Sequence, residues 1–172
     1  MRWLVMDPGG KNFACTLLEN DIPLWFGYHP IVKFFKISDM EIYNAFLKAT
    51  KIMYKKADCL IIERYVQRRP IRGLSQEGLN TMIANVITLA LEKNKIIFPL
   101  TASSWKSKVD YDVCINFGRR IGYLKGDQHF MDTMLMYSIV TKQRYPKIFK
   151  NGLEAYNIFK EKQKKRRKKE RK

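Results

Sequence analysis

Residues 2–28, which read RWLVMDPGGKNFACTLLENDIPLWFGY, decide the fold. Three short apolar runs lie within this stretch, at residues 2–7, 13–18 and 22–28. They are separated by Gly9-Gly10 and by Asn20-Asp21, and residues of these types signal turns, whereas short apolar runs between turns are typical of strands. Because both connections are short, the three strands are predicted to form an antiparallel meander at the start of a sheet.

More strands and helices follow along the chain. Apolar side chains recur at helical spacing over residues 39–56, which predicts a helix. The run CLII at residues 59–62 is short and continuously apolar, so a central strand buried on both faces is predicted there. The next helix, at about residues 76–92, has an apolar stripe that Leu89 and Leu91 make broader than one packing face requires. A partner subunit is a candidate for covering the surplus.

The last core elements complete an α/β fold. Residues 95–98 are predicted to form a fifth strand that Pro99 ends, and a helical stretch is predicted around residues 109–120. Asp127 is a candidate N-cap for a last core helix, which runs to about residue 142. This order of elements predicts a mixed five-stranded sheet, with its first three strands antiparallel, flanked by helices.

Positive charge is the strongest feature of the composition. The chain has 172 residues, 46% of them hydrophobic, and 33 Lys+Arg against 16 Asp+Glu give a formal net charge of +17. Residues 1–145 are predicted to form one domain, and residues 146–172 a basic C-terminal extension that is helical or disordered. Residues 160–172 carry ten basic and two acidic residues, so residues 1–159 keep a net charge of +9. The folded part is basic by itself, and a polyanionic partner is expected.

Cysteine usage and hydropathy indicate the compartment. Cys15, Cys59 and Cys114 stand far apart without a C-x-x-C pair, which argues against a disulfide framework and a structural zinc. No apolar run approaches the ~18 residues of a membrane span, and the sequence opens on a strand-like run rather than on a signal peptide. A cytoplasmic protein with buried cysteines and no membrane contact is therefore predicted.

Carboxylates stand where two predicted strands end. Asp7 closes the first strand and Glu63 follows the fourth. Either acid alone would more often be solvated or paired with an arginine, but two strands that end in acids can bring both to one edge of the sheet. His129 and Asp132 are three positions apart in the last core helix, so they share one face. Three carboxylates and an imidazole suit one or two hard divalent cations such as Mg²⁺ or Mn²⁺.

The same residues carry a family resemblance. The motifs are Asp7-Pro8-Gly9, Leu60-Ile61-Ile62-Glu63 and His129-x-x-Asp132. Over about residues 1–142 the sequence resembles the RuvC-type Holliday junction resolvases of the ribonuclease-H-like nuclease superfamily, in particular their phage and viral branch. The resemblance implies a ribonuclease-H-like fold and a location in the host cytoplasm if the protein is viral. It implies that the metal-binding catalytic residues are Asp7, Glu63, His129 and Asp132. It also implies that Lys106, just after the fifth strand, lies near the scissile phosphate.

A cationic loop follows the fourth strand. Its sequence at residues 64–73, RYVQRRPIRG, contains a proline, a glycine and four arginines. The arginines are Arg64, Arg68, Arg69 and Arg72. They are predicted to bind the DNA backbone, with a solvated loop as the alternative. Tyr65 is the best match to the aromatic wedge that the bacterial resolvases carry here, and packing of its ring on the domain is the alternative.

The residues and the resemblance together predict an enzyme, a crossover junction endodeoxyribonuclease that acts in DNA recombination and repair. It would bind four-way and other branched DNA as a homodimer, because two symmetric cuts need two sites. Asp7 would bridge two Mg²⁺ ions, with Mn²⁺ able to substitute, and Glu63 and Asp132 would each hold one. His129 would complete a site or position the attacking water. Two alternatives stay open: an RNA-processing nuclease on the same fold, and a non-catalytic nucleic-acid-binding protein.

Overall fold

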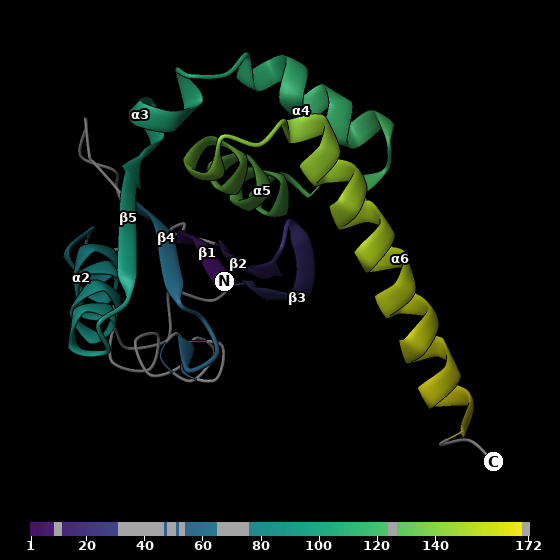
Figure 1. Cartoon of the computed structure of the whole chain (residues 1–172), viewed down its shortest axis with the longest axis horizontal. Coiled ribbons are helices and arrows are strands. Elements are labelled where there is room, and N and C mark those ends of the chain that lie inside the picture. Colours follow the sequence, from purple (N-terminus) through teal and green to yellow (C-terminus); the bar gives the residue numbers. More distant parts are fainter. Residues whose placement is uncertain are drawn as a thin grey trace.

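One mixed sheet forms the centre of the computed structural model, in the strand order β3-β2-β1-β4-β5 (Figure 1). The structure describes residues 1–8, 12–30, 47, 51, 54–64, 76–123 and 127–169. The strands are β1 (Arg2–Pro8), β2 (Asn12–Glu19), β3 (Ile22–Pro30), β4 (Cys59–Arg64) and β5 (Ile96–Thr101). β2 is antiparallel to both β1 and β3, whereas β4 is parallel to both β1 and β5. The predicted mixed sheet with an antiparallel start is confirmed.

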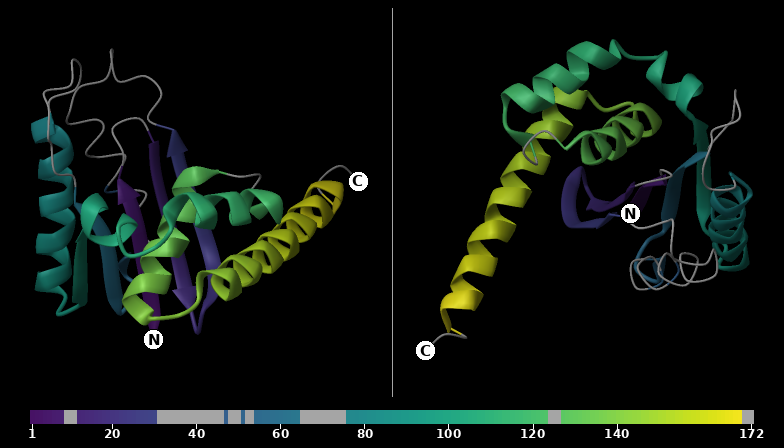
Figure 2. Two further views of the ribbon diagram at one scale, coloured as in Figure 1. Left: turned by 90° about the horizontal axis from the view of Figure 1, so that it is seen from above. Right: turned by 180° about the vertical axis from the view of Figure 1, so that it is seen from behind.

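Helices lie on both faces of this sheet. They are α2 (Gln76–Glu92), α3 (Ala102–Lys106), α4 (Tyr111–Arg120), α5 (Gln128–Thr141) and α6 (Tyr145–Lys169). The predicted N-cap of α5 is confirmed, because the Asp127 carboxylate accepts hydrogen bonds from the backbone N–H groups of His129 and Phe130, at 3.0 and 3.2 Å. Figures 1 and 2 show α2 against one face of the sheet and α5 across the other, with α4 and α6 beside α5.

The alternation of side chains along each strand divides the core in two. Val5 and Ile61 point to the face that α5 covers, where they join one buried cluster. Leu4 and Leu60, their chain neighbours, join a second cluster with Met82 of α2. The central strand β4 is buried on both faces at residues 59–62, as the CLII run predicts. The three cysteines are free and buried, also as predicted.

The prediction for the segment after α2 is wrong in two details. β5 runs through Pro99 to Thr101 instead of ending before the proline. A proline is tolerated there because β5 is an edge strand, which among the described residues has a ladder partner on one side only. The short helix α3 was not predicted. Its start is fixed by a capping box, in which the Thr101 hydroxyl accepts from the Ser104 N–H and the Ser104 hydroxyl oxygen accepts from the Thr101 N–H.

The helix predicted over residues 39–56 lies mostly outside the described residues. Of the residues described within it, Leu47, Lys51 and Tyr54 are helical, and Lys55 and Lys56 form a turn. Tyr54 is buried against the α2 face of the sheet.

Helix α6 belongs to the core at its start and leaves it towards its end. Ile148 and Phe149 are fully buried in the cluster around α5. The remainder of α6 extends away from the sheet (Figure 2). The first turns of the predicted C-terminal extension therefore contribute to the hydrophobic core. None of the helices in the described ranges has the length and apolar character that crossing a membrane requires.

Candidate active site

The strand register brings Asp7 and Glu63 together. β1 and β4 are parallel with Val5 opposite Ile61, so Asp7 and Glu63, each two residues further on, lie at the same edge of the sheet. Because side chains alternate, both carboxylates point to the face that α5 covers. Asp7 is only 7% exposed. Because buried charge is costly unless it is paired, these two carboxylates need partners that offset their charge.

Asp7 is paired with His129 from the first turn of α5. Nδ1 of the imidazole lies 2.8 Å from Oδ2 of Asp7. This hydrogen bond raises the pKa of His129 above its ordinary value, although partial burial acts in the opposite direction. The protonated ring is therefore favoured, and it offsets the charge of Asp7.

Glu63 is held by a tryptophan that follows β5. The indole Nε1–H of Trp105, a fully buried residue of α3, donates to Oε2 of Glu63 at 3.0 Å. Burial and then the nearby charge of Asp7 raise the pKa of Glu63 to about 7, although Lys106 and the indole hydrogen bond act to lower it. Glu63 is thus a carboxyl group whose charge the surrounding protein leaves largely uncompensated.

Asp132 is held from two sides. The hydroxyl of Tyr111 donates to Oδ1 at 2.6 Å, and Nζ of Lys106 lies 3.6 Å from Oδ2. Gln128 donates in turn to the Tyr111 hydroxyl at 2.8 Å. Burial raises the pKa of Asp132 to about 6 even though Tyr111 and Lys106 favour its charged form. Two partners therefore orient the side chain, but burial still makes its charged form unfavourable.

Lys106 lies between two aromatic rings beside these acids. Its Nζ is 4.9 Å from the ring centroid of Trp105 and 4.8 Å from that of Tyr111. Contacts of this kind fix an ammonium group without removing its charge. The Lys106 side chain is 34% exposed, so the cation is held at the site and is still reached by solvent.

The donor groups suit a divalent cation by their chemistry. Asp7 and Asp132 both raise the pKa of Glu63 through charge repulsion, so the carboxylates share a site that is short of positive charge, and carboxylate oxygens are preferred ligands of Mg²⁺. Across the described residues, no three His, Cys, Asp or Glu side chains converge on one point that would hold an ion. The carboxylates contact protein groups instead, so they would have to move closer together to hold an ion.

Solved structures of RuvC have the same arrangement of sheet and helices. T. thermophilus RuvC in complex with a Holliday junction substrate aligns with a TM-score of 0.61 at 10% identity, over 83% of this chain and 95% of that chain. A second Thermus thermophilus RuvC structure gives a TM-score of 0.56 at 12% identity, over 83% and 96% of the two chains. The chain has the RuvC fold.

Other comparisons are weaker. The yeast mitochondrial Holliday junction resolvase aligns with a TM-score of 0.49 at 13% identity, over 91% of this chain and 83% of that chain. No protein-family model matches the sequence, and no curated protein matches it. The RuvC fold is therefore established by structure, and the assignment to a phage and viral branch stays a prediction.

The predicted DNA-binding loop follows β4 of the RuvC fold. Arg64, the last residue of β4, is exposed and directly follows Glu63. The other residues predicted to bind DNA are Tyr65, Arg68, Arg69 and Arg72. They lie outside the described residues, and their roles stay predictions.

Sequence reasoning did not find the residues that hold the carboxylates. Trp105 and Tyr111 contact Glu63 and Asp132 from positions 42 and 21 residues away in the chain. One signal was available for Trp105, since it directly precedes Lys106, the lysine that the RuvC resemblance selects. No spacing rule identifies Tyr111, which reaches Asp132 only because α4 folds back beside α5 (Figure 1).

Stability in the absence of metal is expected to fall as the pH rises from 5 to 8. The pKa of Glu63 is about 7 in the folded chain against an ordinary 4.5, and that of Asp132 about 6 against 3.8. The folded state thus holds these protons more tightly, so their stabilising contribution is complete below the ordinary values and is lost as the pH passes the folded values. For Glu63 the loss is on the order of 3 kcal/mol.

Urea denaturation in EDTA at several pH values measures this loss. The Glu63→Gln variant cannot ionise at position 63, so its stability should decline less over the same range. Parallel declines in the two proteins would contradict the assignment to Glu63.

Proposed function

We propose that the chain is a metal-dependent endonuclease that binds four-way and other branched DNA junctions and resolves them by paired nicks. The observation that carries the proposal is the placement of three electrostatically coupled carboxylates and an imidazole in one region of a RuvC fold. These are Asp7, Glu63, Asp132 and His129. Such an activity would serve DNA recombination and repair.

Two further observations support this proposal. One of the RuvC structures that aligns with the chain was solved with a Holliday junction substrate. The formal net charge of +17 suits a partner made of phosphates. Three of the 16 acidic residues of this basic protein lie in one region. Hydrolysis of a bound polyanion would use both the positive surface and these clustered acids.

The carboxylates would hold the metal. Asp7 would bridge two Mg²⁺ ions, for which Mn²⁺ is able to substitute, and Glu63 and Asp132 would each hold one. Bound ions of this kind activate a water molecule and stabilise the leaving oxygen of a phosphodiester. Their charge would also offset the repulsion among the carboxylates, which together with burial raises the pKa of Glu63.

The remaining groups of the site would orient the carboxylates and neutralise charge on the phosphate. Trp105 holds Oε2 of Glu63 and leaves Oε1 for a ligand, and Tyr111 holds Oδ1 of Asp132. His129 would complete a metal site or position the attacking water. Lys106, solvent-accessible between its two aromatic rings, would contact an oxygen of the scissile phosphate.

A homodimer would supply two such sites for the two cuts. Leu89 and Leu91 of α2 are 37% and 61% exposed, and they leave apolar surface that a second copy would bury. Static light scattering tests this part of the proposal, and a monomer at working concentration would contradict it.

A panel of nucleic acids tests the activity. The full chain is incubated in Mg²⁺ or Mn²⁺ with a four-way DNA junction, linear duplex DNA, an RNA duplex and an RNA–DNA hybrid. Symmetric nicks in the junction, with little cutting of the other substrates and none in EDTA, are expected. Preferential cutting of RNA would support an RNA-processing nuclease, and binding without cutting in either metal would support a non-catalytic binding protein. Either result would overturn the proposed function.

A further inference from the structure

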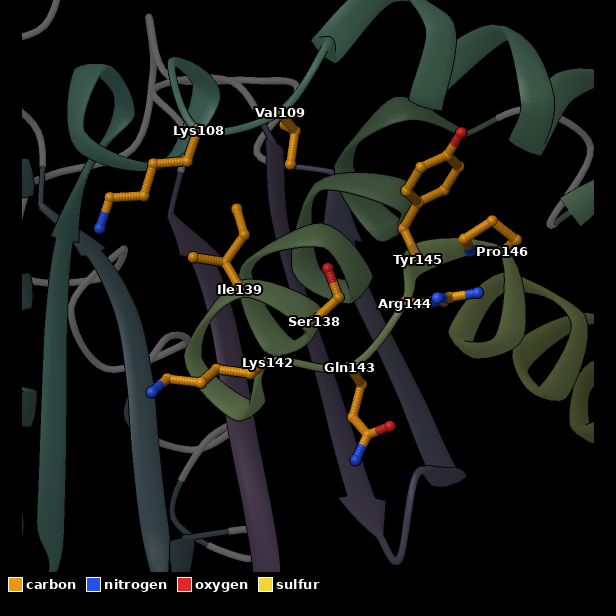
Figure 3. A pocket seen from close by; sticks show the side chains of 9 residues that line it. All are labelled: Lys108, Val109, Ser138, Ile139, Lys142, Gln143, Arg144, Tyr145 and Pro146. Carbon is orange, nitrogen blue, oxygen red and sulfur yellow. The ribbon is translucent and has the colours of Figure 1, made fainter.

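A second candidate site, a pocket with cations at its rim, includes the last turn of α5, at the opposite end of that helix from His129. It is a pocket of about 480 Å³ between the turn after α3, the last turn of α5 and the start of α6 (Figure 3). Val109 and Ile139 give it apolar walls, and three cations, Lys108, Lys142 and Arg144, line it. In Figure 3, Lys108 and Lys142 extend to one side of the pocket and Arg144 to the other.

Positive charge predominates around this pocket, although the charge of Asp110 acts on the lining residue Tyr145. No acidic residue lines it. Within the described ranges, the ion pairs are formed by other cations, such as Lys147 with Asp21 at 3.1 Å, and none includes Lys108, Lys142 or Arg144. Three cations at a pocket without an acid are suited to an anion.

The backbone at Lys142 supplies an independent observation. Lys142 is the C-cap of α5 and has the left-handed conformation, with φ 57° and ψ 26°. Glycine or asparagine is usual where a helix ends this way, because the Cβ atom of other residues is crowded by the backbone in that conformation. Here a lysine occupies the position, and it is one of the residues that line the pocket. A strained residue kept at a pocket points to a use for its side chain.

We propose that this pocket binds a backbone phosphate of the DNA arm whose other end enters the carboxylate site. The inference rests on the proposed function for its choice of ligand. His129 and Lys142 are separated by the length of α5, which is about 20 Å for 13 residues. Successive base pairs rise by about 3.4 Å, so the phosphate in the pocket lies roughly six base pairs from the scissile one.

A polymer phosphate fits the pocket better than a free ion does. The volume of about 480 Å³ exceeds what a single phosphate fills, and the apolar walls offer contact to a sugar. The cations flank the pocket on two sides, so a strand can pass between them. A second contact on the same arm would also fix its direction relative to the carboxylates, which a single contact cannot do.

The Lys142→Gly variant separates binding from folding. Glycine relieves the left-handed strain, so the variant should melt no lower than wild type. Removal of one phosphate contact should weaken binding roughly fivefold to tenfold at 0.1 M salt and reduce the slope of log K against log [salt] by about one. Binding is measured by fluorescence anisotropy with a four-way junction, with Asp7→Asn in every protein so that nothing is cut.

Controls show whether the effect is local. Lys142→Arg keeps the charge and should bind like the parent protein. Lys93→Ala removes an exposed lysine at the end of α2, and it should change neither the affinity nor the slope. Equal losses in Lys93→Ala and Lys142→Gly would overturn the proposal, because the pocket would then act only through net charge. An unchanged affinity in a Lys108→Ala, Lys142→Gly double variant would overturn it as well.

Neutral phosphates locate the contact. Single methylphosphonates are placed along one arm, and substitution about six base pairs from the cleavage point should weaken binding of the parent protein but not of Lys142→Gly. Equal losses in both proteins at every position would overturn the assignment. The failure of this test is distinct from failure of the proposed function, because binding is measured without cleavage, and a chain that cuts no junction still reports on the pocket when it binds duplex DNA.

Discussion

Asp7→Asn is expected to lose junction cleavage by at least about a thousandfold while it binds the junction as tightly as wild type. Asparagine fills the same space on β1 and keeps one oxygen, but it cannot supply the negative charge that a bridging metal ligand needs. Asp7 is buried beside His129 and is an anion that would not itself contact a DNA phosphate, so the affinity should not fall. Single-turnover cleavage in saturating Mg²⁺ and anisotropy in Ca²⁺ or EDTA measure the two quantities.

Asp112→Asn is the matched control for this variant. Asp112 is an exposed residue in the first turn of α4, so the substitution makes the same chemical change away from the site. It should cleave at the wild-type rate. Cleavage retained in Asp7→Asn, or lost equally in both variants, would contradict the role given to Asp7.

Glu63→Gln is expected to lose cleavage to a similar extent and, at pH 8 in EDTA, to be more stable than wild type. The glutamine carbonyl can still accept the hydrogen bond from Trp105, whereas the buried charge that raises the pKa of Glu63 to about 7 is gone. Function and stability thus move in opposite directions at this position, as expected where a site keeps a costly group for its chemistry.

Addition of metal gives this prediction a second measurement. Mn²⁺ should raise the melting temperature of wild type and have little effect on Glu63→Gln, because a ligand stabilises only the state that binds it. Glu154→Gln, an exposed change on α6, serves as the control and should respond to Mn²⁺ as wild type does. A Glu63→Gln variant that is less stable than wild type at pH 8 would show that Glu63 has a structural role.

The strand-end acids were within reach of sequence reasoning because strand geometry is simple. Two apolar runs that each end in a carboxylate, in strands that the element order makes neighbours, must bring those carboxylates to one edge. The spacing of His129 and Asp132 likewise determines that they share a helix face. Both inferences use only local periodicity and the order of the elements. In the structure, Nδ1 of His129 lies 2.8 Å from Oδ2 of Asp7.

Contacts between side chains from distant elements were not within reach. Trp105 belongs to no recognisable motif. Its indole donates a hydrogen bond to Glu63 only because α3 starts where β5 ends. The burial of Ile148 and Phe149 was not predicted for a different reason. They belong to the same helix as the basic tail, and the composition of that helix as a whole is strongly charged. Composition averages over a helix, whereas burial is decided turn by turn.

The continuity of α6 has a consequence for the DNA arms. A disordered basic segment could contact phosphates over a wide range of distances. The basic segment of this chain instead ends a 25-residue helix whose first turns pack in the core. Such a helix is about 37 Å long, which is close to the length of one turn of B-DNA, about 34–36 Å. A tail of this kind would contact phosphates only within a fixed distance of the core. Junction arms much shorter than one turn would leave its end without a phosphate, whatever the sequence of the arm.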